Sequence, residues 1–170
     1  MRDTLIVIGL ALVAIVIGVF MFLYGQGTFS STPPAAVSYT PPAVTVPFTQ
    51  LAQGEHSTVS TRANYLITSK SELADLWAMV DARGQVPAVD FTTNSVIAVF
   101  AGKEPTAGYT IAVSKIQDAS TREVIVTLSA PGGSCVLAQK ATAPYQIIEL
   151  PKTSLNLTHQ DLLTTTSCLK

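Results

Sequence analysis

The stretch that decides the fold of this chain is SVIAVFA, residues 95–101, which is apolar at every position after Ser95. A strand with one solvated face alternates apolar and polar residues, whereas a strand covered on both faces is apolar throughout. We therefore expect residues 95–101 to form a central, buried strand.

A short helix is expected on the N-terminal side of this strand. Ser69 and Glu72 have the spacing of a capping box, in which each side chain bonds an exposed backbone N–H group of the other residue. Gly84 predicts the end of the helix, and residues 64–68 (NYLIT) predict a strand before it. Four residues at helical spacing form its apolar, core-facing side: Leu73, Leu76, Trp77 and Val80.

The residues after the central strand predict further strands. Apolar residues alternate in 109–113 and again in 124–128, so each of these strands buries one face. The turn residues 118–121 connect the two as a hairpin, and residues 146–150 predict another strand. Towards the C-terminus the chain becomes polar, with a weak helical pattern in 158–163.

One helix followed by several strands indicates an α+β domain, an antiparallel sheet with the helix packed against one face. A β-sandwich with a helix insertion is the alternative. We place this globular domain at 55–152 and a C-terminal tail at 153–170, because all charged residues except Arg2 and Asp3 lie beyond residue 54.

Residues 5–24, LIVIGLALVAIVIGVFMFLY, are an uncharged apolar segment long enough to cross the ~30 Å hydrocarbon core of a bilayer. We predict a transmembrane anchor that follows a short cytoplasmic segment, residues 1–4. Arg2 precedes the span and the next basic residue is Arg62, so the positive-inside rule places the rest of the chain outside the cytoplasm. A cleaved signal peptide is the alternative.

Residues 25–54 contain no charged residue and five of the ten prolines. Proline-rich segments favour extended polyproline II geometry and do not build a packed core. We expect this segment to be a linker that spaces the domain from the membrane.

The composition excludes several classes of function. The 170 residues carry a net charge of −1, which offers no electrostatic basis for nucleic-acid binding. Two isolated histidines without metal-ligand spacing argue against a zinc site. Neither a G-x-S-x-G elbow nor a phosphate-binding glycine loop is present. We therefore expect a protein that is not an enzyme and has no cofactor, metal or small-molecule substrate.

The two cysteines, Cys135 and Cys168, both follow the predicted membrane span. An even number of cysteines in an oxidising compartment favours a disulfide between them. A remote alternative is a hydrolase in which Cys135 is a nucleophile activated by His56 or His159.

An ordered set of short motifs runs through the predicted domain. Its members are Asn64-Tyr65, Leu76-Trp77, Val89-Asp90-Phe91, Gly102, Pro105–Tyr109, Pro131-Gly132 with Cys135, Thr142-x-Pro144-Tyr145 and Leu150-Pro151-Lys152. This set resembles the C-terminal domain of the PrcB family. The resemblance implies an extracytoplasmic, non-catalytic domain that binds or stabilises a protein partner such as a protease complex. Ala107 departs from the family pattern, where glycine is common, and the tail after Lys152 is additional.

Three loops, at 105–109, 131–133 and 143–145, are also similar in order to the inhibitory loops of chagasin-like cysteine-protease inhibitors. In that family the loops form a wedge on an immunoglobulin-like sandwich. The simpler interpretation of 105–109 is a turn that leads into a strand.

Two of these loops are the candidates for partner binding, because Tyr109 and Tyr145 would supply the aromatic anchors typical of interfaces. Core packing is the alternative for both tyrosines. The candidate partner-binding residues are Pro105, Thr106, Gly108, Tyr109, Pro144 and Tyr145.

Overall fold

The buried strand predicted at 95–101 is present as strand β4, and the rest of the fold is arranged around it. The computed structural model describes residues 42–168. In chain order its elements are β1 (Val44–Thr45), β2 (Thr49–Gly54), β3 (Ala63–Ile67), α2 (Lys70–Trp77), β4 (Asn94–Phe100), β5 (Thr110–Asp118), β6 (Arg122–Pro131), β7 (Tyr145–Pro151) and β8 (Leu157–Thr166).

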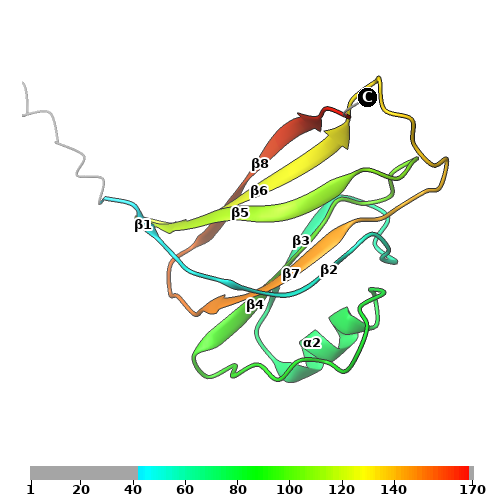
Figure 1. The fold of residues 1–170 in the computed structure, drawn as a ribbon. Helices are drawn as coiled ribbons and strands as arrows, with labels where there is room; N and C mark the ends of the chain where they lie inside the picture. Colours follow the sequence, from blue (N-terminus) through cyan, green and yellow to red (C-terminus); the bar gives the residue numbers. More distant parts are fainter. Residues whose placement is uncertain (1–41, 169–170) are drawn as a thin grey trace, which may run out of the picture. The chain divides into compact units, whose positions relative to one another are not determined.

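The strands form two four-stranded sheets, with orders β1-β5-β6-β8 and β2-β7-β4-β3 (Figure 1). All strand pairs are antiparallel except β6 and β8, which are parallel. The expected antiparallel strands are therefore present, and residues 42–168 contain one α-helix, as expected. The strands are divided between two sheets, as in the sandwich alternative, and do not form the one sheet that the α+β expectation names.

Strand β4 is covered on both faces because its alternate residues contribute to two different cores. Ile97 and Val99 pack with residues of β5 and β6 in the core between the sheets. Val96, Ala98 and Phe100 pack on the other face with Leu73 and Leu76 of α2. The apolar run in the sequence thus reflects a middle layer between a sheet and a helix.

Helix α2 begins at the predicted capping box and ends earlier than expected. The backbone N–H of Glu72 donates to Ser69 Oγ at 3.3 Å, and the N–H of Ser69 donates to Glu72 Oε2 at 3.2 Å. The last helical residue is Trp77, well before Gly84. Val80 instead pairs with Ser57 in an isolated bridge, and this tertiary pairing draws the chain out of helical geometry.

Two segments expected outside the domain are part of its sheets. Strands β1 and β2 lie within the predicted 25–54 linker, and β2 pairs with β7. Strand β8 replaces both the tail at 153–170 and its weak helical pattern, because β6 offers an edge to which the threonine-rich segment can bond. The folded unit therefore extends beyond 55–152 at both ends.

No helix within residues 42–168 is long and apolar enough to span a membrane. The predicted anchor at 5–24, the segment 1–4 and most of the predicted linker lie outside the described residues.

Candidate partner-binding site

The structure brings the first predicted loop, 105–109, against the segment 131–145 that contains the other two, at one end of the sandwich, and Gly108 lies beside Pro131. The N–H of Glu104 donates to the carbonyl oxygen of Thr142 at 2.8 Å, and the Thr142 hydroxyl donates to the carbonyl oxygen of Thr106 at 3.0 Å. The N–H of Ala107 donates to the carbonyl oxygen of Ala138 at 3.2 Å. The β4–β5 loop, which holds the predicted residues 105–109, is therefore fastened to the β6–β7 loop.

Within the β4–β5 loop, Pro105 and Gly108 are exposed, while Thr106 and Tyr109 are half-buried. Gly108 has φ +94°, a conformation that side-chain-bearing residues rarely adopt. This loop is a tight turn into β5 that offers part of its surface to solvent.

The other two predicted residues, Pro144 and Tyr145, are buried. Tyr145 is 1% exposed and its ring stacks on Phe100 at a centroid distance of 6.2 Å. Burial, with a smaller contribution from the nearby Asp81 carboxylate, raises the pKa of Tyr145 to about 12. The Tyr145 ring thus belongs to the core on the helix side of β7, so the predicted loops do not form one exposed wedge.

Tyr109 and Pro144 do lie at one cavity of about 350 Å³, which Gln50, Gln53 and Glu55 line from the side of β2. This cavity is the place where residues of both predicted loops line one depression.

The predicted disulfide between Cys135 and Cys168 is confirmed, with a Cα–Cα distance of 5.3 Å. Close to it, the N–H of Gly132 donates to the carbonyl oxygen of Thr166 at 2.9 Å. The disulfide therefore holds the end of β8 against the end of β6. A disulfide-bonded sulfur has no thiolate, so the bonded Cys135 lacks the nucleophile that the hydrolase alternative requires.

A groove that the sequence did not predict lies at the open side of the sandwich, between the edge strands β3 and β8. It consists of two cavities of about 360 and 170 Å³ that share Leu66, Ile97 and Leu157, and we call it the edge groove. Leu66 of β3 is 50% exposed and Leu157 of β8 is 42% exposed. Apolar side chains of both sheets, which the sandwich leaves uncovered at this edge, thus line one continuous depression.

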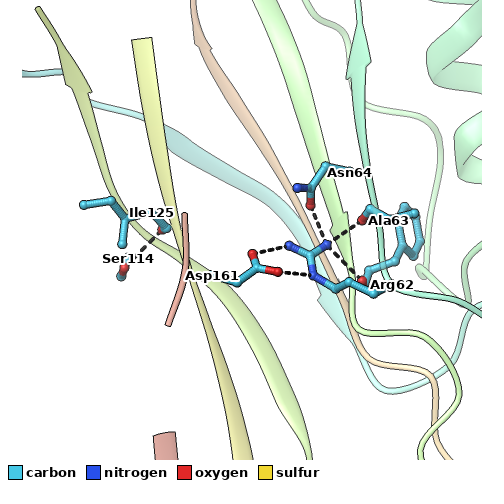
Figure 2. A network of polar contacts seen from close by, with 7 residues as sticks. Arg62, Ala63, Asn64, Ser114, Ile125 and Asp161 are labelled. Atoms are coloured by element: carbon cyan, nitrogen blue, oxygen red, sulfur yellow. Dashed lines mark hydrogen bonds and ion pairs between the residues drawn. The ribbon is translucent and has the colours of Figure 1, made fainter. Parts of the chain in front are cut away.

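Arg62 closes one end of the edge groove by joining the two sheets (Figure 2). Its guanidinium group donates to both carboxylate oxygens of Asp161 on β8, at 3.0 and 2.6 Å. It also donates to Asn64 Oδ1 at 2.5 Å and to the carbonyl oxygens of Ala63 and Phe100 at 2.8 and 3.2 Å. This network fixes β8 relative to β3.

Arg122 lies at the other end of the edge groove and is 4% exposed. Its guanidinium group donates to both carboxylate oxygens of Asp118, each at 2.7 Å, and to the carbonyl oxygen of Pro151. The hydrogen bonds from Arg122 hold the pKa of the Asp118 carboxyl below its ordinary value. The buried charge is thereby paired, as a stable interior requires.

The sequence could not reveal the edge groove because its two walls are far apart in the chain and β8 had a helical pattern. The exposure of Leu66 and Leu157 is a property of the fold that the sequence does not state. Within the part of the chain that the structure describes, no three His, Cys, Asp or Glu side chains gather as a metal site would need. The lining of the edge groove offers apolar contact and strand edges.

The family model described as PrcB C-terminal matches residues 95–151, from β4 to the end of β7. This range contains four of the eight motifs on which the resemblance rests, including those in the β4–β5 and β6–β7 loops, and Leu150-Pro151 of a fifth; the three motifs before residue 95 lie outside it. No curated protein and no solved structure matches the chain. The predicted resemblance is therefore confirmed, and residues 95–151 of this chain are a match to the PrcB C-terminal family.

Proposed function

We propose that this protein is a membrane-anchored, extracytoplasmic and non-catalytic binding protein, whose PrcB-like domain holds a protein partner. The observation that carries the proposal is the edge groove, in which half-exposed leucines of two sheets surround an apolar depression. Apolar pockets bordered by polar groups are the usual anchor points of protein interfaces. The match to the PrcB C-terminal family supports the same role. A protease complex is the kind of partner that the resemblance implies.

The partner is expected to insert an apolar side chain between β3 and β8. Leu66 and Leu157 line both cavities of the edge groove, so such a side chain would contact both leucines. Arg62 and Arg122 are already bonded to carboxylates, so the contribution of the groove is mainly apolar. The exposed part of the β4–β5 loop, with Pro105 and Gly108, is the second surface that a partner could contact.

Crosslinking and pull-down of the full-length protein from its native membrane tests the proposal. The Leu66→Ser variant is expected to recover about tenfold less partner, the effect of losing a contact worth ~1.4 kcal/mol. The matched control is Val136→Ser, since Val136 is a fully exposed apolar residue in the β6–β7 loop. Equal recovery of a partner by both variants would exclude the edge groove as the binding site.

The proposed membrane orientation has its own test. Protease added to the outside of intact cells should digest the β-domain, while protease added only to the cytoplasmic side should leave it intact. Protection from outside protease in intact cells would contradict an extracytoplasmic domain.

The chagasin-like alternative retains one supporting observation, the contact between the β4–β5 and β6–β7 loops. Because Pro144 and Tyr145 are buried, the third loop, 143–145, is not exposed as an inhibitory wedge would require. If the protein were an inhibitor of this kind, it would inhibit a papain-like protease at micromolar concentration, and absence of inhibition would exclude this alternative.

A further inference from the structure

Strand β8 has an outer edge that no strand covers in the part of the chain that the structure describes (Figure 1). Its pairing with β6 continues without a register shift from Leu157 to Thr166, and all of its residues are exposed. Natural edge strands are usually protected by lysine, proline, a bulge or an inward-pointing charge; β8 contains no lysine, proline or bulge, and its one carboxylate, Asp161, is paired with Arg62. A long, regular edge of this kind is a template for pairing with another strand.

Two hydrogen bonds establish which backbone groups of β8 point outward. The N–H of Arg122 donates to the carbonyl oxygen of Asn156, and the N–H of Gly132 donates to that of Thr166, both at 2.9 Å. Backbone groups of successive residues in a strand point to opposite sides, so the even-numbered residues face β6. The outward donors and acceptors belong to the odd-numbered residues: Leu157, His159, Asp161, Leu163 and Thr165.

The side chains of these residues are arranged symmetrically around Gln160. Leu157 and Leu163 lie three residues to either side of it, and His159 and Asp161 are its immediate neighbours. Leu163 is 82% exposed, so an apolar side chain at this end of β8 is left in solvent. The segment is therefore complementary to a reversed copy of itself.

We propose that β8 pairs antiparallel with β8 of a second copy of this chain, with the two-fold axis at Gln160. In this register His159 lies opposite the partner's Asp161, and Leu157 lies opposite the partner's Leu163. The Asp161 carboxylate accepts two hydrogen bonds from Arg62 and keeps further lone pairs, so an imidazole N–H opposite it can donate to it as well, and the leucine pairs cover each other. Each opposing pair of outward-facing residues also exchanges its backbone hydrogen bonds.

The neighbouring registers are less favourable for a physical reason. A shift in one direction places the two Asp161 carboxylates opposite each other, and like charges in direct opposition are destabilising. A shift in the other direction places the two His159 side chains opposite each other and leaves Asp161 opposite the partner's Leu157. A register offset by one residue would place side chains on one face of the first β8 opposite side chains on the other face of the second β8.

Site-directed disulfide crosslinking of the full-length protein in its native membrane tests this pairing. In Gln160→Cys, each new cysteine lies opposite its copy with Cα atoms about 4.5 Å apart, the separation of a non-hydrogen-bonded antiparallel pair. That distance permits a disulfide, so mild oxidation is expected to give a covalent dimer.

The matched control is Leu162→Cys, on the same face of β8. Its copy would lie four residues along the strand, about 14 Å away, and no dimer is expected. When Thr158→Cys and Leu162→Cys are produced together, the two different chains are opposite each other and should crosslink. Leu66→Ser lies on β3, so it should leave the Gln160→Cys crosslink unchanged even if it abolishes partner binding.

Three outcomes would overturn self-pairing through β8. They are a monomeric Gln160→Cys variant, equal crosslinking of Gln160→Cys and Leu162→Cys, and crosslinking of Gln160→Cys to a different protein. Titration of free thiols, with the Cys135–Cys168 bond intact, confirms that each variant is folded.

Discussion

Gln146 illustrates, at the scale of single residues, how a polar side chain is accommodated in the core. It lies on β7 and is 5% exposed. Its Oε1 accepts from the N–H of Val113 on β5 at 2.6 Å, and its Nε2 donates to Gln50 Oε1 at 2.8 Å. The register of β5 shifts between Val113 and Lys115, so Gln146 supplies an acceptor for Val113 from the opposite sheet.

Gln146→Leu is expected to lower the free energy of unfolding by about 1–3 kcal/mol, the cost of leaving a buried N–H without an acceptor. Urea unfolding can be followed by the fluorescence of Trp77, the only tryptophan of the chain. Gln139→Leu, in the exposed β6–β7 loop, is the control and should stay within about 0.5 kcal/mol of the parent. Similar effects of the two substitutions would contradict a role for Gln146 in the core.

Acid is expected to weaken the domain through the carboxyl of Asp118. The Arg122 guanidinium lowers the pKa of this carboxyl from its ordinary value of 3.8. A carboxyl with a lowered pKa in the folded state contributes stability above its ordinary pKa, and this contribution is lost as the pH falls through the lowered value. Unfolding measured from about pH 7 to about pH 3 should show a smaller acid-induced loss for Asp118→Asn than for the parent.

Asp118→Asn should also be less stable at neutral pH, because Arg122 would then be buried without its carboxylate. Asp75→Asn, on the exposed side of α2, is the control. An acid-induced loss that is identical in Asp118→Asn and the parent would show that the Arg122 pair does not contribute.

At the scale of elements, α2 and β8 differ in how far the sequence predicts them. The start of α2 depends on Ser69 and Glu72, which are neighbours in the chain, so the capping box was predictable. Strand β8 depends on β6, which lies more than thirty residues earlier. Its weak helical pattern in 158–163 was overridden because β6 supplies a ladder of backbone partners that an isolated helix cannot match.

Loss of the Cys135–Cys168 bond should release β8 selectively. Replacement of both cysteines by serine removes the covalent link at the end of a strand whose residues are all exposed. Hydrogen exchange should accelerate at the even-numbered amides of β8 and remain slow in β4, which is buried between two layers. We expect the free energy of unfolding to fall by about 2–4 kcal/mol. Unchanged exchange in β8 would mean that the Arg62 network alone holds the strand.

At the scale of the whole molecule, the boundaries of the folded unit can be tested with two fragments. Residues 42–168 contain both sheets, and this fragment should unfold cooperatively in urea. Residues 55–152, the domain expected from the sequence, lack β1, β2 and β8. Without them the edges of β5, β6 and β7 are exposed, so this fragment should aggregate or unfold at a lower urea concentration. Equal stability of the two fragments would contradict the structural role of the added strands.

The candidate site was predictable only in part, because its exposed surface depends on how segments distant in sequence pack together. The β4–β5 loop was predicted from local turn residues, and it is partly exposed at the end of the sandwich. Tyr145 was predicted as an anchor, yet β7 directs it towards α2, where it stacks on Phe100. Which face of a strand meets solvent depends on the layers that cover it, and local sequence does not specify those layers when a strand is buried on both sides.

The sequence by itself determined the buried strand at 95–101, the start of the helix, the hairpin of β5 and β6, and the resemblance to the PrcB C-terminal family. Each of these depends on residues close together in the chain or on an ordered set of motifs. Only the tertiary structure decided that two sheets form, that the chain from β1 to β8 belongs to them, and that an apolar groove opens between β3 and β8. These features depend on contacts between segments distant in sequence, whose free energy is gained only when the segments meet.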